Sequence, residues 1–526
     1  ANALAGALGL DPSLAPEPYT WVLDGSDRHV ETLRRLSTSG VPVEWLAPKV
    51  KFTGEATLDR LRLEITRKKD WFGLDGEVTV DERRVSLAAL LEAARERRRF
   101  VKLGEGDFAQ LSETMVEALA PLSHLSQGDA LPQLTPGTAP LLEALAPQLE
   151  ALDAAKEWSA LMERLAESRT ARFPVPKTLK ATLRDYQVEG FEWMSRLAQW
   201  GVGACLADDM GLGKTVQALA LLLSRAKRGP ALVVAPSSVL HTWREEASRF
   251  APSLRLALFH EGDRALGELG PMDVVVVSWS LLAREATAFS DVRFTTVILD
   301  EAHAIKNADT LRAKAAHRLQ ADFLVALSGT PIENHVGELW SLFKAVMPTL
   351  LGSEESFRRR FGAGQREALA ALSTLIRPFV LRRTKGAVAK ELPPRTDLEV
   401  IVPLSAEERA LYDDVRLSAV ADLGELTGES KRFDVLAALT RLRLTACHPK
   451  LVDAAWAGPT SKLSRLLELV ESLSAAGHRV LVFSQFTQHL ALVVEALRSQ
   501  GVVFSYLDGQ VPLAERHRRV EAFQQG

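Results

Sequence analysis

Cysteine is scarce in this sequence, since Cys205 and Cys447 are the only two among 526 residues. Two thiols in apolar or helical surroundings offer no disulfide framework and no zinc cluster, and they fit a reducing cytosol. Long hydrophobic runs are also missing, because no stretch approaches the roughly 20 apolar residues that cross a bilayer. The formal net charge is only −3. Any contact with nucleic acid must therefore come from local patches, because the molecule as a whole has no basic field.

The residues that are present have the composition of a globular protein, with 47% hydrophobic and 25% charged residues. At this length about two to four domains are expected, because one core seldom organises so many residues. The chain shows no charged and apolar leader and begins at Ala1 rather than Met, so we expect a fragment or a processed chain. These features predict a cytoplasmic protein without a membrane partner.

The amino-terminal region carries short strand patterns. Residues 58–65 alternate apolar and charged positions, as a half-buried strand does. Residues 71–80 and 100–108 continue the pattern with glycine-containing turns, and Ser86 can cap the helix that follows it. We therefore predict a small mixed α+β module within 1–125.

The character of the sequence then changes twice. Residues 126–140 are rich in Pro, Gly and Ser, which is typical of a linker, so 126–170 is predicted as a linker and a helix. From about residue 200 the chain contains apolar, β-branched runs that end in polar, Gly or Pro residues. Such runs predict a parallel sheet covered by helices, with the chemistry at the carboxyl ends of the strands. The runs are 231–236, 272–278, 296–303 and 323–331.

The same pattern returns late in the chain, at 479–486 and 502–509, and it predicts the strands of a second α/β lobe. About 150 mostly helical, Arg-rich positions separate the two sets of runs. Because usual connectors have about 5 residues, these positions must form structured insertions. Ser405 and Glu408 form a capping box that begins one of the inserted helices.

The stretch LADDMGLGKT contains the end of a phosphate-binding loop, with one departure. Asp208 stands where the full pattern begins with Gly. Gly211 and Gly213 still let the backbone turn its N–H groups inward. Lys214 can reach the β and γ phosphates of a nucleotide, the hydroxyl of Thr215 can hold Mg²⁺, and the dipole of the next helix would face the anion. The alternative is a glycine-rich turn with an exposed lysine.

Two adjacent acids, Asp300 and Glu301, end the apolar run TVIL, 85 residues after Thr215. On a strand of the same sheet they can divide the work, with Asp300 in the Mg²⁺ shell and Glu301 orienting and deprotonating the attacking water. The alternative is a capped helix start, because acids favour helix N-termini. His303 can relay between these acids and the end of the next strand, or it can be an ordinary surface histidine.

These motifs belong to a longer series. In order, the chain contains LRDYQVEGFEWM, LADDMGLGKT, APSSVLHTWREE, LDEAHAIKN, LSGTPIEN, RPFVLRRTKGAVAKELPPR, LRLTACHP, VLVFSQFT and YLDGQVPLAERHRRVEAF. Together they resemble the SWI/SNF family of ATP-dependent double-stranded DNA translocases, of helicase superfamily two, over 180–526. An Asp at the first-Gly position is usual in that family, so the loop resembles a working one. The KKDWFGLDGEVTV region is similar to the module associated with the bacterial branch.

The resemblance implies an α/β fold with two RecA-like P-loop lobes, the second incomplete, with helical insertions, preceded by the small α+β accessory module. Lobe 1 would span 171–395 with a helical insertion from about 335. Lobe 2 would span 396–526 with an insertion at 405–450. The last two motifs of the family, with the arginines that reach across from lobe 2, would follow Gly526. We therefore expect this chain to bind ATP but to hydrolyse it poorly.

The resemblance also implies roles for matched residues. Catalysis would depend on Lys214, Asp300 and Glu301, with Mg²⁺ held by Thr215 and Asp300. An amide such as that of Gln187 offers the donor and the acceptor that suit adenine. The implied ATP-binding residues are Arg184, Tyr186, Gln187, Asp209, Met210, Gly211, Leu212, Gly213, Lys214 and Thr215, and the implied coupling residues are His303, Ser328, Gly329 and Thr330.

DNA contacts are implied just after strand ends, where hydroxyls and free backbone N–H groups can bind the phosphates of one strand. Each serine alone can equally be a helix cap. The basic residues Arg382, Arg383 and Lys385 can touch DNA or brace the lobe interface, and bracing is favoured for Arg383. The implied DNA-contacting residues are Ser237, Ser238, Ser278, Ser484, Gln485, Thr487 and Arg516.

The working hypothesis is an ATP- and Mg²⁺-dependent motor that moves along double-stranded DNA and remodels protein–DNA complexes near a bacterial nucleoid. Phosphate contacts carry no base information, so binding would be independent of sequence and sensitive to salt. One alternative is a strand-separating helicase, against which the long helical insertion and the LRRTK motif argue. Another is a nucleotide-dependent module that recruits RNA polymerase or other DNA-bound proteins without translocating.

Overall fold

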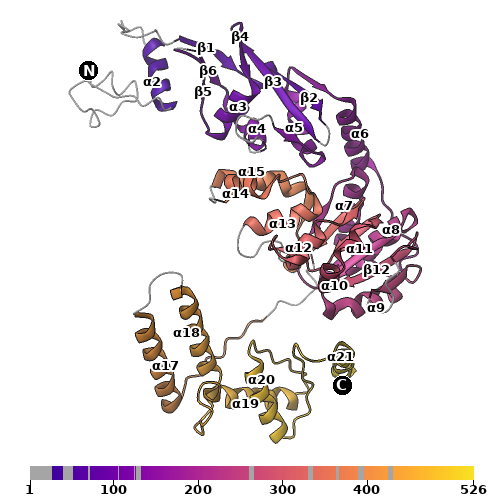
Figure 1. Cartoon of the computed structure of the whole chain (residues 1–526), viewed down its shortest axis with the longest axis vertical. Helices are drawn as coiled ribbons and strands as arrows, with labels where there is room; N and C mark the ends of the chain where they lie inside the picture. The colour runs from indigo at the N-terminus through magenta and orange to yellow at the C-terminus, as the bar shows by residue number, and fades with distance from the viewer. Residues whose placement is uncertain are drawn as a thin grey trace, which may run out of the picture. The chain divides into compact units, whose positions relative to one another are not determined.

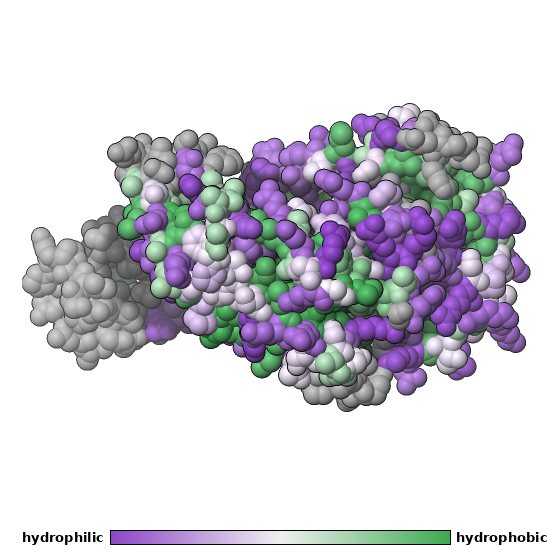
Figure 2. Space-filling view, turned by 90° about the horizontal axis from the view of Figure 1, so that it is seen from below, coloured by the Kyte–Doolittle hydropathy of each residue, from purple (hydrophilic) through white to green (hydrophobic). Residues whose placement is uncertain are grey.

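The computed structural model describes residues 27–38, 51–68, 71–104, 106–123, 125, 132–259, 266–329, 336–362, 366–388, 396–424 and 430–525. It divides into two compact units, unit 1 (Ala1–Leu392) and unit 2 (Pro393–Gly526) (Figure 1). None of the described helices is long and apolar enough to cross a membrane. Hydrophilic residues are interspersed among hydrophobic ones over the face in Figure 2.

The amino-terminal part of unit 1 is a module with two small sheets, ordered β4-β3-β2-β8 with β7 beside β3, and β1-β6-β5. In β2 the residues Leu61, Leu63 and Ile65 are buried and the two residues between them are exposed, so the predicted alternation is confirmed. Ser86 caps α3 by accepting a hydrogen bond from the backbone of Ala89, as predicted. The elements are α2 Asp27–Thr38, β1 Lys51–Ala56, β2 Leu61–Arg67, β3 Phe72–Val80, β4 Arg83–Ser86, α3 Leu87–Arg95, β5 Phe100–Gly104, β6 Asp107–Leu111, α4 Glu113–Ser123, β7 Gln133–Leu134, α5 Ala139–Leu145, β8 Ala151–Ala154 and α6 Lys156–Thr170.

The segment 132–154 is part of this module, so the linker prediction is wrong there. β7 pairs with β3, and β8 pairs in parallel with β2. The proline- and glycine-rich stretch makes a tight turn that packs inward: a β-carbon at Gly137 would lie 2.5 Å from Met347 Cε. A composition typical of loops therefore marks a buried turn here. Residues 126–131 of the predicted linker lie outside the described residues.

Lobe 1 contains a seven-stranded sheet ordered β11-β12-β10-β14-β16-β9-β17, and every pairing in it is parallel. The four predicted runs form β10, β12, β14 and β16. Their central residues are buried on both faces, because helices such as α8 (Lys214–Arg225) and α9 (Leu240–Phe250) lie around the sheet (Figure 1). The parallel α/β prediction is confirmed. The strands are β9 Ala204–Leu206, β10 Ala231–Ala235, β11 Arg255–Leu258, β12 Asp273–Ser278, β14 Thr296–Leu299, β16 Leu324–Leu327 and β17 Val380–Leu381, with a separate pair β13 Arg293–Phe294 and β15 Gln320–Ala321.

Helices connect these strands and continue into the predicted insertion after residue 335. The insertion is helical as predicted, and its helix α15 packs against α4 of the amino-terminal module. One hydrophobic cluster extends from the module into lobe 1, which explains why both belong to one compact unit. The helices are α7 Asp185–Trp200, α8 Lys214–Arg225, α9 Leu240–Phe250, α10 Trp279–Arg284, α11 Ala286–Ser290, α12 Leu311–Ala316, α13 Val336–Val346, α14 Glu354–Phe361, α15 Arg366–Ile376 and α16 Lys385–Val388.

Cys205 lies in the middle of β9 and is fully buried. Burial raises the pKa of its thiol to about 12. The thiol therefore behaves as a small apolar side chain in the centre of the sheet.

Unit 2 consists of helices in its described part. The capping box at Ser405 is confirmed, because Glu408 N donates to Ser405 Oγ at 3.2 Å and Ser405 N donates to Glu408 Oε2 at 2.8 Å. The predicted insertion at 405–450 forms an antiparallel pair of long helices (Figure 1). The helices are α17 Ala406–Gly424, α18 Ser430–Cys447, α19 Ser461–Ala475, α20 Thr487–Ser499 and α21 Leu513–Gln525.

The strands predicted at 479–486 and 502–509 are absent, since no strand occurs in the described residues of unit 2. Alternate residues of the first run, Val480 and Val482, still pack against the hydrophobic cluster of α19 and α20. The residues that alternate with them, Leu481 and Phe483, are 65% and 87% exposed. A strand requires a neighbour that accepts and donates backbone hydrogen bonds, and these two runs have no such neighbour among the described residues.

Candidate functional site

The phosphate loop connects β9 to α8. Gly211 and Gly213 have φ angles of 83° and 73°, which residues with a β-carbon disfavour. Gly213 is the N-cap of α8, so the positive end of the helix dipole faces the loop. Lys214 Nζ donates hydrogen bonds to the backbone oxygens of Asp208 at 2.7 Å and Asp209 at 3.3 Å. The loop thus has the geometry of an anion-binding turn.

Asp208, which replaces the usual glycine, is fully buried and paired. Its Oδ1 accepts a hydrogen bond from Arg383 Nε at 2.9 Å and its Oδ2 accepts one from Nη2 at 2.6 Å. Gln217 Nε2 donates to the same carboxylate at 3.4 Å. A charge can be buried here because a bidentate arginine compensates it. The aspartate therefore ties the loop to a residue 175 positions later in the chain.

Space for this arginine comes from a glycine in α7. A β-carbon at Gly190 would lie 2.0 Å from Gln217 Oε1 and 2.7 Å from Arg383 Nη2. Arg383 also donates to the backbone oxygen of Tyr186 and lies over its ring, with Cζ 5.3 Å from the centroid. Arg383 is therefore a brace, although the elements that it joins all belong to unit 1 rather than to two lobes.

The backbone on either side of Arg383 also follows the phosphate loop. β17 pairs with β9. Asp209 N donates to Arg383 O at 3.0 Å, and Lys385 N donates to Asp209 Oδ2 at 3.0 Å. The segment 380–388 thus forms one wall of the phosphate site, which no spacing in the sequence had indicated.

The residues implied in adenine binding lie at the start of α7, next to the loop. Tyr186 Oη donates to the backbone oxygen of Leu212 at 3.2 Å, and Gln187 Nε2 donates to the same oxygen at 3.1 Å. Gln187 Oε1 accepts from Arg184 N at 3.0 Å. These contacts place the three residues beside the phosphates' site, and their role toward adenine stays a prediction.

Asp300 follows β14 and is held by two tryptophans. Trp243 Nε1, from α9, donates to Asp300 Oδ2 at 2.8 Å, and Trp279 Nε1, from α10, donates to the backbone oxygen of Asp300 at 3.0 Å. The second carboxylate oxygen, Oδ1, accepts from Glu301 N at 2.9 Å. Sequence reasoning missed both tryptophans. The only signal for Trp243 was its place in the APSSVLHTWREE motif.

Glu301 has a strained backbone, with φ of 47° in the left-handed region. Glu301 is the N-cap of a short 3-10 helix, Ala302–Ile305, so the alternative of a helix start holds for its position. Its side chain makes no capping hydrogen bond, so it is not used as a cap. Its buried Oε2 accepts no hydrogen bond within the described part of the chain, although His303 Nδ1 lies 3.2 Å away. A buried carboxylate oxygen with open capacity is suited to a water molecule or a cation.

The electrostatics show a surplus of negative charge. Burial raises the pKa of the Asp300 carboxyl, the hydrogen bond from Trp243 opposes this, and the nearby Glu301 adds to the rise. Burial also raises the pKa of Glu246 on α9, with a contribution from Asp300. Burial lowers the pKa of Lys214, against the attraction of Glu301 and the other acids. One ammonium thus faces several carboxylates in poorly solvated space.

The residues present fit Mg²⁺ and a nucleotide. Mg²⁺ keeps several waters and takes one or two protein ligands together with phosphate oxygens, so no complete protein cage is needed. In the described ranges, no three His, Cys, Asp or Glu residues form a metal-binding group by themselves. Asp300 and Thr215 would supply the protein ligands. Lys214 and the N-terminus of α8 would complement the phosphates.

The coupling residues lie beside the same loop. Ser328 follows β16, and its backbone N–H donates to Leu206 O at the end of β9 at 3.1 Å. A β-carbon at Gly329 would lie 3.1 Å from Met210 Cγ, so these residues approach the phosphate loop closely. Thr330 lies outside the described residues.

The serines of unit 1 that are implied in DNA contacts follow strands of the sheet at the same edge as Asp300 and Glu301. Ser237 and Ser238 are exposed in a short turn after β10. Ser278, after β12, caps α10 by accepting from its backbone at 3.2 Å, so the cap alternative holds for this serine. In the register Ala235 lies opposite Ser278. The contact with DNA stays a prediction for all three.

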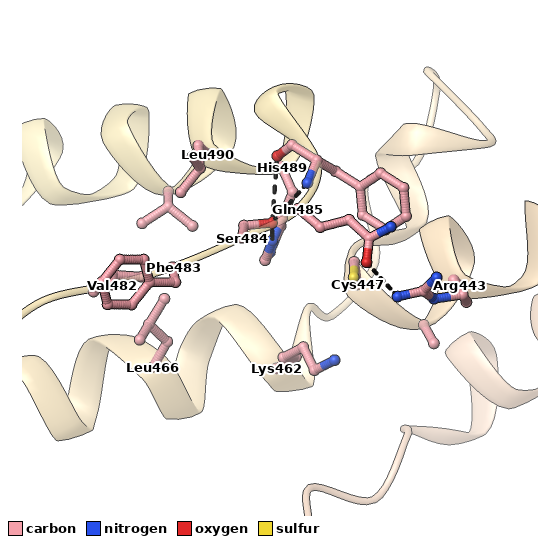
Figure 3. Close-up of a pocket in the computed structure, with 13 residues that line it drawn as sticks. Arg443, Cys447, Lys462, Leu466, Val482, Phe483, Ser484, Gln485, His489 and Leu490 are labelled. Carbon is pink, nitrogen blue, oxygen red and sulfur yellow. Dashed lines mark hydrogen bonds between the residues drawn. The ribbon is translucent and has the colours of Figure 1, made fainter. Parts of the chain in front are cut away.

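In unit 2, two of the implied DNA contacts line a cavity of about 470 Å³ between α18, α19, α20 and the 482–486 segment (Figure 3). Ser484 Oγ lies 3.2 Å from His489 Nδ1, and Arg443 donates to Gln485 Oε1. Thr487 begins α20, and Arg516 donates to the backbone oxygen of Asp508. The cavity residues are Arg443, Ala446, Cys447, Lys462, Leu466, Val482, Phe483, Ser484, Gln485, Phe486, His489, Leu490 and Val493.

Two protein-family models match the chain, the SNF2-related domain at 186–451 and the helicase conserved C-terminal domain at 461–526. YwqA of Bacillus subtilis is 36% identical over 395 residues, which are 71% of this chain and 43% of that protein. The SWI/SNF-related matrix-associated actin-dependent regulator of chromatin subfamily A member 1 of Mus musculus is 33% identical over 395 residues, which are 69% of this chain and 38% of that protein. The chain spans less than half the length of these two relatives.

Among solved structures, the SWI2/SNF2 ATPase core of Sulfolobus solfataricus in complex with double-stranded DNA is 34% identical. The match covers 67% of this chain and 78% of that chain, with a TM-score of 0.41. Because this TM-score is low, the likeness is one of sequence and carries no structural argument.

Proposed function

Because the chain belongs to the SNF2-related domain family, we propose that it binds ATP on lobe 1 and is the core of a motor that translocates along double-stranded DNA. The observation that carries the proposal is the meeting of Lys214, Asp300 and Glu301 at one edge of the parallel sheet. Ser237 and Ser238 are exposed after β10, and the partly exposed Ser278 follows the adjacent strand β12. One edge thus offers groups for a triphosphate and groups for a phosphate backbone.

In the proposed reaction, Lys214 and the loop's N–H groups hold the phosphates. Thr215 and Asp300 would hold Mg²⁺, which would neutralise charge on the phosphate oxygens. Glu301 orients the attacking water and accepts its proton, since its Oε2 has open hydrogen-bonding capacity. His303, whose Nδ1 lies 3.2 Å from that oxygen without a hydrogen bond to it, would relay between the acids and the end of β16.

Movement would follow from two lobes that bind successive phosphates of one DNA strand. ATP bound on lobe 1 would favour a closed arrangement of the lobes, and hydrolysis would reverse it. Ser237, Ser238 and Ser278 would serve lobe 1, and the DNA residues predicted in unit 2 would serve lobe 2. Contacts limited to phosphates make binding independent of sequence and steeply dependent on salt.

The central test is ATP turnover by the full-length protein with and without duplex DNA. We expect duplex of any sequence to raise the rate and higher salt to weaken the effect. Lys214→Ala should abolish nucleotide binding while Lys227→Ala, an exposed lysine beyond the end of α8, should bind nucleotide as the natural protein does. Turnover that does not respond to duplex would overturn the motor proposal.

The two alternatives have their own readouts. Release of a strand from a forked substrate would indicate a strand-separating helicase. We further propose that the motor acts in the cytoplasm on proteins bound to DNA, RNA polymerase among them, with the scarcity of cysteine as support for the location. If Lys214→Ala left recruitment of such partners intact and the natural protein did not translocate, an interaction module would be the better description.

A further inference from the structure

Two tryptophans link the implied DNA-contact segments to the carboxylate that would hold Mg²⁺. Trp243 lies in α9, which follows the turn of Ser237 and Ser238, and Trp279 comes directly after Ser278. Both indole N–H groups donate hydrogen bonds to Asp300: Trp243 Nε1 to Oδ2 at 2.8 Å and Trp279 Nε1 to the backbone oxygen at 3.0 Å. The two side chains are only 1% and 3% exposed.

Each link is short and its indole is buried, so a displacement of the serine segment would move the indole as well. The serine turn after β10 leads straight into α9, and Ser278 is itself the N-cap of α10. β10 lies between β12 and β14 in the sheet. Asp300 N donates to Val234 O at 2.7 Å. Both serine segments and Asp300 therefore lie at the same edge of three neighbouring strands. The two indoles connect the helices that follow the serines to Asp300 through hydrogen bonds.

We propose that Trp243 and Trp279 are positioning residues through which duplex DNA at the strand ends and a Mg²⁺-bound nucleotide at Asp300 strengthen each other's binding. This inference rests on the proposed function. Phosphates bound at the serines would fix the starts of α9 and α10, and with them the two N–H donors that orient Asp300. Because coupling between sites is reciprocal, nucleotide should tighten DNA binding by the factor by which DNA tightens nucleotide binding.

The hydrogen bonds can be separated from the packing of the rings. Phenylalanine keeps most of the buried apolar surface of tryptophan and lacks the indole N–H. Trp243→Phe and Trp279→Phe therefore test the link itself. Trp193→Phe is a matched control, because Trp193 Nε1 donates to Pro378 O at 3.3 Å, away from Asp300.

The first experiment measures the Kd for a short duplex with and without Mg²⁺ and a non-hydrolysable ATP analogue. For the natural protein we expect nucleotide to lower this Kd on the order of tenfold, a usual size for such coupling. In Trp243→Phe, Trp279→Phe and the double variant the ratio should fall toward one. In Trp193→Phe it should stay at the natural value.

The outcomes separate the inference from the proposed function. If the natural protein binds neither nucleotide nor duplex, the proposed function fails. If it binds both, the inference is overturned by a ratio of one in the natural protein, by an unchanged ratio in both indole variants, or by an equal loss in Trp193→Phe.

A second measurement is made on the natural protein and uses the variants only to assign its signals. Indole N–H signals of the ¹⁵N-labelled natural protein can be assigned to Trp243 and Trp279 from the signal that each variant lacks. Duplex added without nucleotide should shift these two signals and leave that of Trp193 in place. Two unshifted signals in the presence of bound duplex would overturn the link.

Discussion

Two runs of this chain, TVILDEAH in unit 1 and VLVFSQFT in unit 2, have similar patterns and different structures. The first begins with β14, which lies between β10 and β16 and whose residues Thr296–Leu299 are all buried. In the second, Leu481 and Phe483 are 65% and 87% exposed. An apolar run thus specifies which side chains seek the core, whereas neighbouring strands decide whether its backbone becomes part of a sheet.

The polar ends of the two runs differ in the same way. Asp300 is fixed by two buried indoles and by a backbone N–H at distances of 2.8 to 3.0 Å. Ser484 bonds mainly within its own turn and to His489, at the wall of an open cavity. Chemistry that needs fixed geometry is therefore found where strands on both sides hold the strand end.

The largest effect should come from breaking the pair that braces the phosphate loop. Arg383→Ala leaves the buried carboxylate of Asp208 without its partner, which should lower the free energy of unfolding of unit 1 by about 3–5 kcal/mol. Urea denaturation should show an earlier transition for unit 1 and an unchanged one for unit 2. Arg382→Ala, at an exposed neighbour, should shift neither. Equal effects of the two substitutions would contradict the assignment of Arg383 as the brace.

A matched pair of leucines compares the two runs directly. Leu299 in β14 is fully buried, so Leu299→Ala should cost about 2–5 kcal/mol through lost burial and a cavity. Leu481 occupies an exposed position in the other run, and Leu481→Ala should change stability by less than about 0.5 kcal/mol. Thermal unfolding of both variants gives the comparison. A large loss in Leu481→Ala would mean that this run is covered in solution.

The smallest predicted effect is the loss of stability of unit 1 when the pH is lowered. Burial lowers the pKa of His317 in unit 1, whose Nε2 lies 3.0 Å from Ser341 O. Because the unfolded chain takes up the proton more readily, the stability that this residue contributes above pH 6.5 should be lost as the pH falls below that value. His317→Gln should flatten the pH dependence of the unit 1 transition. That of unit 2, where burial lowers the pKa of His448 and His489, should keep its slope.

Much of lobe 1 could be predicted because its information is local. The runs that form β10, β12, β14 and β16 are apolar on both faces. The glycines and the lysine of the phosphate loop lie within a few residues of one another, so their spacing alone predicts the loop. The alternation in β2 and the cap at Ser86 are equally local. Such features depend on periods and caps, which the order of residues displays directly.

The remainder depends on residues that meet only after folding. Nothing in the spacing pairs Asp208 with Arg383, 175 positions away, or directs two indoles to Asp300. The turn at Gly137 has the composition of a linker, yet it packs against Met347 and Leu350, which follow α13 in lobe 1. The prediction of strands in unit 2 is wrong because a strand also needs a neighbouring strand to pair with. The apolar pattern is present in the sequence, but the described residues contain no such neighbour.

The burial of Cys205 has a practical consequence for experiments on this chain. A thiol whose pKa is about 12 remains protonated at the pH of maleimide labelling and does not react. Cys447 is partly accessible and borders the cavity of unit 2 (Figure 3). A fluorescent dye should therefore attach to the natural sequence at one place, giving a reporter of unit 2 without any substitution.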